Sequence, residues 1–87
     1  MHELRLYSRQ GCCLCASLER RLRALDFNHI RVTLIVVDID APEVPTPLKV
    51  RYDLEVPVLF LDTTELPRVP PRLAGDRLMA WLIKTIT

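Results

Sequence analysis

The sequence predicts an α/β domain in which three helices pack on a mixed four-stranded sheet, in the order β-α-β-α-β-β-α. Three observations lead to this prediction. The hydrophobic period switches repeatedly between two, as in strands, and about 3.6, as in helices. A strand, a helix and a strand come first, which requires a parallel pair with a right-handed crossover. A short turn after Leu61 then requires an antiparallel pair.

The first strand and the first helix are separated by a short loop. Polar and apolar residues alternate over residues 3–7, which predicts a strand that ends near Tyr7. Residues 8–11 are predicted to form the loop. From Cys12 the apolar spacing is helical, and we expect this helix to end within residues 26–28.

The second strand and the second helix occupy the middle of the chain. The strand is predicted over residues 30–39, where the unbroken apolar run 34–37 is typical of a strand covered on both faces. A short helix is predicted over residues 47–53, because Pro47 suits the first turn and Thr46 can cap it.

The last third of the chain contributes two strands and a helix. We expect a third strand over residues 58–61, a turn over 62–64 and a fourth strand over 66–69, which Pro67 confines to the edge of the sheet. Asp76 is expected to cap the last helix.

Length and composition indicate one domain over residues 1–87. The chain has 87 residues, of which 49% are hydrophobic, enough for a core of its own. Its 12 basic and 11 acidic residues give a net charge of +1, so charge offers no argument for nucleic acid as a partner. No segment approaches the roughly 20 apolar residues of a membrane helix, and the N-terminus has no signal-peptide pattern. We therefore expect a cytoplasmic protein without a membrane partner, and a monomer is the default expectation for a chain of this size.

The three cysteines lie within four residues, so they cannot cross-link the fold and instead point to chemistry. Cys12 falls at the start of a predicted helix, where unpaired N–H groups and the helix dipole favour a thiolate. Cys15 lies one turn later on nearly the same side, so the two sulfurs can form a disulfide. This pattern predicts thiol–disulfide exchange, with Cys12 attacking and Cys15 resolving the mixed disulfide. Cys13 receives no role.

A different interpretation of the cysteines is a metal site. Zinc takes four ligands, and the only further candidates with typical ligand chemistry are the two histidines, neither of them at ligand spacing. We therefore expect no metal in a monomer. A third interpretation, in which Cys15 is partly a small core residue, stays open.

The sequence around the cysteines resembles the short glutaredoxin-like proteins of bacteria, whose active site reads C-x-L-C. The matching segments are residues 6–15 (LYSRQGCCLC), 36–40 (VVDID) and 51–59 (RYDLEVPVL), so the resemblance covers nearly the whole chain. It implies the thioredoxin-like fold. It also implies an oxidoreductase that reduces protein or glutathione mixed disulfides through Cys12 and Cys15, with glutathione as a co-substrate and no bound cofactor.

The resemblance also implies a set of substrate-binding residues. In this family the proline that matches Pro57 is cis and lies against the cysteine pair, so that the backbone of Val56 can pair with glutathione or a thiol peptide. Arg9 matches a lysine that meets a glutathione carboxylate. Gly75 and Asp76 stand where the family has a double glycine before the last helix. Asp76 would bind the glutathione amino group there, an alternative to its role as a helix cap.

Two other functions stay open at this point. Two protomers could share an iron–sulfur cluster or another metal through Cys12, although such proteins more often have Ser or Gly at the position of Cys15. The chain could also be a thiol-based redox-sensing adaptor that catalyses little. The sequence departs from the family at two positions. Glu55 stands where a threonine is usual, and the single Gly75 stands where the family has two glycines. Both departures argue against the use of glutathione.

Overall fold

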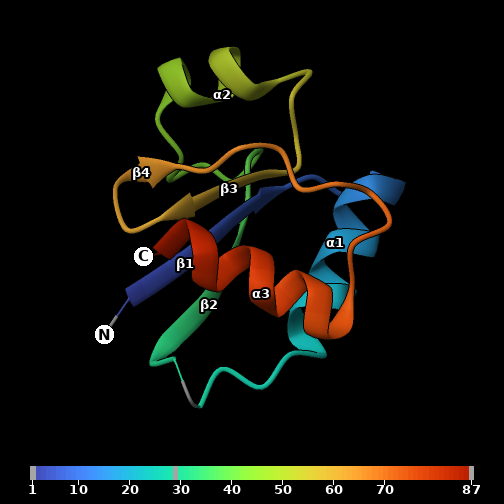
Figure 1. Cartoon of the computed structure of the whole chain (residues 1–87). Coiled ribbons are helices and arrows are strands. Elements are labelled where there is room, and N and C mark those ends of the chain that lie inside the picture. The colour runs from blue at the N-terminus through green and yellow to red at the C-terminus, as the bar shows by residue number, and fades with distance from the viewer. Residues whose placement is uncertain (1, 29, 87) are drawn as a thin grey trace.

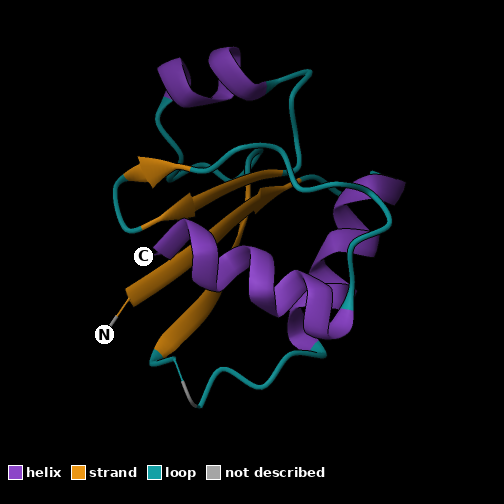
Figure 2. Cartoon of the chain, viewed as in Figure 1, coloured by secondary structure: helices purple, strands orange, loops and turns teal. Residues whose placement is uncertain are grey.

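The computed structural model describes residues 2–28 and 30–86, which form a sheet with helices on both faces (Figures 1 and 2). The strands are β1 (His2–Ser8), β2 (Val32–Asp38), β3 (Val58–Leu61) and β4 (Thr64–Glu65). The helices are α1 (Cys13–Arg23), α2 (Thr46–Tyr52) and α3 (Gly75–Ile86). Their order along the chain is the predicted β-α-β-α-β-β-α.

The sheet is mixed, and its strand order is β2-β1-β3-β4. β1 is parallel to β2 and antiparallel to β3, and β3 is antiparallel to β4. In the centre of the sheet, Leu6 lies between Val36 on one side and Leu59 on the other. This arrangement confirms the predicted thioredoxin-like architecture of a mixed four-stranded sheet with three helices.

The alternation of β1 divides the core between the two faces of the sheet. Leu4 and Leu6 point to the face that α1 and α3 cover, while Tyr7 points to the opposite face, where α2 packs. The larger cluster comprises Leu4, Leu6, Leu18, Leu22, Val32, Leu59, Leu61, Leu66, Leu78 and Leu82. The smaller cluster comprises Tyr7, Ile39, Val44, Tyr52 and Val58. Each fully buried leucine contributes about 1.5–3 kcal/mol of hydrophobic free energy to folding.

The first helix is shorter than predicted. It ends at Arg23 instead of within residues 26–28. Beyond it, the Asp26 side chain accepts a hydrogen bond from the backbone N–H of Asn28 at 3.0 Å. Such a local side-chain turn competes with continuation of a helix, so the chain leaves α1 here.

The second strand is also shorter than the predicted range 30–39. Arg31 has a φ of 51°, a left-handed conformation that interrupts an extended strand at its start. At its end, Asp38 accepts a hydrogen bond from the backbone N–H of Asp40 and turns the chain. Residues 34–37 are only partly buried, not covered on both faces as predicted, and β2 lies at the edge of the sheet.

The fourth strand was predicted over 66–69, and this prediction is wrong. Asp62 has a φ of 54°, so the chain turns tightly after β3 and pairing resumes at once, in β4. The backbone N–H of Leu66 still donates to the carbonyl of Leu59, at 2.9 Å. Pro67 has no N–H to donate, so the hydrogen-bond ladder between β3 and β4 cannot extend further.

The predicted N-caps of α2 and α3 are both wrong. The N-cap of α2 is Pro45 without a side-chain hydrogen bond, and Thr46 lies inside the helix, which spans 46–52 instead of 47–53. α3 begins at Gly75, so Asp76 lies in its first turn and is not the cap. A carboxylate there still interacts favourably with the helix dipole. Within the described part of the chain, no helix is both long enough and apolar enough to cross a membrane.

Candidate active site

Cys12 and Cys15 form a disulfide at the start of α1, with their Cα atoms 5.2 Å apart. Cys12 is the N-cap residue, with extended backbone, and its Sγ accepts a hydrogen bond from the backbone N–H of Cys15 at 3.1 Å. Two features place it there. Gly11 adopts a φ of 79°, which suits glycine, and the Cys12 N–H donates to the carbonyl of Arg9 at 3.3 Å. The predicted position of Cys12 at the helix start is therefore the observed one.

The two sulfurs differ in accessibility. Cys15 is 1% exposed and belongs to the buried side of α1, whereas Cys12 is half-buried. An incoming thiol or disulfide therefore meets Cys12 first. Cys13 is a free, exposed cysteine, and Leu14 beside it is 60% exposed.

An open groove of about 540 Å³ runs along the cysteine end of α1. The loop after β1, the end of β2 and one side of α1 form its walls. The groove is lined by Ser8, Arg9, Gln10, Gly11, Cys12, Cys13, Cys15, Ala16, Glu19, Val36 and Asp38. The site therefore has room for a substrate on this side of the disulfide.

The loop before β3 approaches α1 from another side. The Val56–Pro57 peptide bond is cis. Val58 pairs with Tyr7 of β1, which brings Pro57 near the loop that precedes the cysteines. Pro57 and Leu14 line the same hollow, so Pro57 is next to the cysteine segment.

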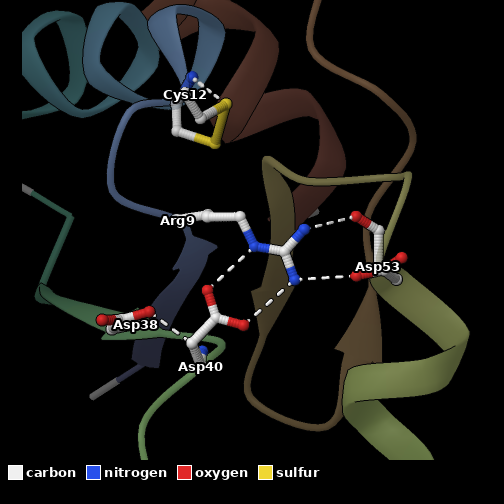
Figure 3. A network of polar contacts seen from close by, with 6 residues as sticks. Arg9, Cys12, Asp38, Asp40 and Asp53 are labelled. Carbon is white, nitrogen blue, oxygen red and sulfur yellow. Dashed lines mark hydrogen bonds and ion pairs between the residues drawn. A yellow bond between two sulfur atoms is a disulfide. The ribbon is translucent and has the colours of Figure 1, made fainter.

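Arg9 binds two carboxylates, as Figure 3 shows beside Cys12. Its Nε and Nη2 donate to the two oxygens of Asp40, at 2.9 and 3.1 Å. Its Nη2 also donates to Oδ1 of Asp53, and its Nη1 to the backbone carbonyl of Asp53, both at 2.9 Å. These hydrogen bonds from the guanidinium hold the pKa of Asp40 below its usual value.

This network gives Arg9 a different environment from the one expected from the resemblance. Four of its hydrogen bonds are made within the chain, where a lysine-like contact to a glutathione carboxylate was expected. Asp40 and Asp53 were not predicted as site residues from the sequence. A signal for Asp40 was available. Because β1 and β2 are parallel and Ser8 pairs with Asp38, the residues that follow the two strands lie close together at the carboxyl end of the sheet.

Gly75 and Asp76 lie away from the cysteine pair. The segment before α3 is tied to α1 by Arg21, whose guanidinium donates to the carbonyls of Pro70 and Leu73. Arg21 is nine residues beyond Cys12, which corresponds to about 13 Å along a helix. Figure 1 shows the start of α3, in orange, beside the end of α1 that is remote from the cysteines. The structure thus joins Cys12, Cys15, Arg9 and Pro57 in one region, but not the start of α3.

Metal-ligating side chains do not gather in the described part of the chain. No group of three or more His, Cys, Asp or Glu residues within 2–28 and 30–86 has the arrangement to hold a metal ion.

The sheet topology and the cysteine pair at a helix start together define a thioredoxin-like domain with a thiol redox site. A sequence model of the Glutaredoxin-like domain (DUF836) matches residues 3–83, and the chain belongs to this family. A comparison with curated proteins finds no match.

Two solved structures are similar to this one. Protein XcR50 from X. campestris, a structural genomics target, is 31% identical, and the match covers 93% of this chain and 96% of that chain with a TM-score of 0.57. The second, described as a malarial protein, is 18% identical, and the match covers 100% and 99% of the two chains with a TM-score of 0.59. At this lower identity the likeness concerns the fold alone.

Proposed function

We propose that the protein is a thiol–disulfide oxidoreductase that reduces disulfides in proteins, or mixed disulfides with glutathione, through Cys12 and Cys15. One observation carries this proposal. Cys12 is the half-buried N-cap of α1 and is disulfide-bonded to Cys15, which is buried one turn further along. A helix N-terminus stabilises a thiolate, which is the attacking species in disulfide exchange.

The reaction begins with reduced protein. The Cys12 thiolate attacks one sulfur of the substrate disulfide, so a mixed disulfide forms, the substrate S–S bond breaks, and the other sulfur leaves as a thiolate that takes a proton from water. Cys15 then loses its proton to solvent and attacks Cys12 Sγ, which releases the second substrate thiolate. The substrate gains two electrons and the protein becomes the Cys12–Cys15 disulfide. An external thiol reductant returns it to the dithiol.

The substrate lies across Val56 and Pro57 in this proposal. An extended peptide can pair with exposed main-chain groups, and the loop at Pro57 lies next to the cysteine segment. Glutathione is one thiol that fits as reductant. We assign the activity to the cytoplasm, where cellular reductants keep such a cysteine pair ready for another cycle.

The test compares wild type with three serine variants, in an assay of a glutathione mixed disulfide with glutathione as reductant and an assay of a protein disulfide with a dithiol as reductant. We expect Cys12→Ser to abolish both activities. Cys15→Ser should accumulate a mixed disulfide, detected as added mass of one substrate half. Cys13→Ser is the matched control and should stay active. Activity that survives in Cys12→Ser would refute the proposal, while activity with the dithiol alone would exclude glutathione as reductant.

A further inference from the structure

An apolar hollow of about 240 Å³ lies beside the cysteine pair, between α1 and the segment that leads to α3. It is distinct from the groove at Cys12. Its apolar walls are Leu14, Leu18, Pro57, Val69 and Pro71. Leu14 lies directly before Cys15 in the sequence and is 60% exposed, so the apolar surface of the hollow reaches the cysteine segment.

Two arginines complete the wall of the hollow, Arg21 from α1 and Arg68 from the segment after β4. Arg21 donates to the backbone carbonyls of Ser17, Pro70 and Leu73, and Arg68 donates to the carbonyl of Glu55 at 3.1 Å. Carbonyls orient a guanidinium but carry no net charge. In the part of the chain that the structure describes, neither arginine forms an ion pair with a carboxylate.

The groove on the other side of α1 has the opposite charge. Arg9 and Asp38 line this groove, and Asp40 and Asp53 bind Arg9 beside it, so these four residues carry a net charge of −2 when ionised. Side chains of α1 separate the two regions. At 3.6 residues per turn, Ala16 of the groove lies about 160° around α1 from Leu14 and Leu18 of the hollow, and Glu19 of the groove lies about 160° from Arg21.

We propose that the apolar hollow binds an acidic segment of a partner protein next to its disulfide, with an apolar side chain against Leu14 and a carboxylate at Arg21 and Arg68. This inference rests on the proposed function. Charge complementarity supports it, because the hollow attracts an anion while the groove at Asp38 repels one. A peptide suits the hollow better than glutathione does, because glutathione has no apolar side chain to place against Leu14.

The test uses two synthetic peptides that are identical except at two positions. In both peptides an apolar residue follows the cysteine, and the two variable positions lie one residue beyond this apolar side chain. One peptide has two glutamates there, and the other has two lysines. Each peptide is reduced as a mixed disulfide with a small chromogenic thiol, and its cysteine-to-serine analogue is used to measure binding to the disulfide form of the protein. We expect wild type to favour the acidic peptide about tenfold in both measurements, less at high salt.

Two charge-reversing variants sharpen the test. Arg68→Glu should abolish or invert the preference. Arg72→Glu makes the same charge change in the same segment, outside the lining of the hollow, and should keep the preference within about twofold. Equal binding of the two serine analogues by wild type, or equal effects of both variants, would overturn the inference. Preferential binding without reduction of either peptide would instead contradict the proposed function and leave the binding site standing.

Discussion

Arg9 and Asp40 form a two-point ion pair, with Nε donating to Oδ2 at 2.9 Å and Nη2 to Oδ1 at 3.1 Å. The same guanidinium reaches Asp53 at the end of α2 (Figure 3). The backbone carbonyl of Arg9 meanwhile accepts the N–H of Cys12. Arg9 therefore connects the loop before Cys12 to the segment that leads into Val56 and Pro57.

Replacement of Arg9 should impair disulfide exchange through geometry. In Arg9→Met the cysteine loop loses its bonds to Asp40 and Asp53, and we expect exchange to slow roughly threefold to tenfold, since small misplacements of reacting groups are costly. Arg9→Lys keeps the charge but cannot form the planar two-point contact, so it should recover only part of the rate. Rates with a peptide disulfide and a dithiol reductant would measure this. Full activity of Arg9→Met would contradict the connecting role of Arg9.

The same ion pair predicts a pH dependence of stability. The pKa of Asp40 is lowered by the Arg9 guanidinium from an ordinary value of 3.8. Since the folded carboxyl holds its proton less tightly than the unfolded one, its stabilising contribution is complete above pH 3.8 and is lost as the pH falls through the lower folded pKa. Urea midpoints between pH 6 and pH 2 should therefore fall less steeply in Asp40→Asn than in wild type. Parallel curves for the two proteins would show that this pair does not contribute.

The sequence predicted the order of elements and the cysteine site because both follow from local patterns. Alternation over β1, helical spacing after Cys12 and a short turn after Leu61 are each visible in a few residues. The errors lie where the backbone conformation of a single residue determines where a strand begins. Arg31 and Asp62 are non-glycine residues with positive φ. Nothing in the sequence indicated that, because of these conformations, β2 would begin later and β4 earlier than predicted.

The site was predicted less completely than the fold, because its partners are distant in sequence. Arg9 is 31 residues from Asp40 and 44 from Asp53, and only the parallel pairing of β1 with β2 brings the first of these into range. The resemblance to the family implied that Gly75 and Asp76, at the start of α3, would bind glutathione at the cysteines. Here the proline-rich segment runs along α1 to Arg21, which places Asp76 elsewhere.

The centre of the sheet should be intolerant of truncation. Leu6 is fully buried between neighbours on β2 and β3, so Leu6→Ala leaves a cavity and should lower the free energy of unfolding by about 2–5 kcal/mol. Leu54→Ala is the matched control, because Leu54 is 92% exposed and its loss should change stability by less than about 0.5 kcal/mol. Urea unfolding of both variants would measure the difference. A loss in Leu6→Ala no larger than in the control would argue against this core.

The cap formed by Cys12 can be separated from its chemistry. Cys12→Ser and Cys12→Ala both remove the disulfide and the proposed nucleophile. Serine can still accept the backbone N–H that Cys12 Sγ accepts from Cys15, and alanine cannot. We therefore expect both variants to be inactive and Cys12→Ser to be more stable than Cys12→Ala by about 1 kcal/mol. Denaturant unfolding under reducing conditions makes the comparison independent of the disulfide. Equal stabilities would mean that the N-terminal turn of α1 is held by its packing through Cys15 and Leu18, and that the side chain at position 12 serves chemistry alone.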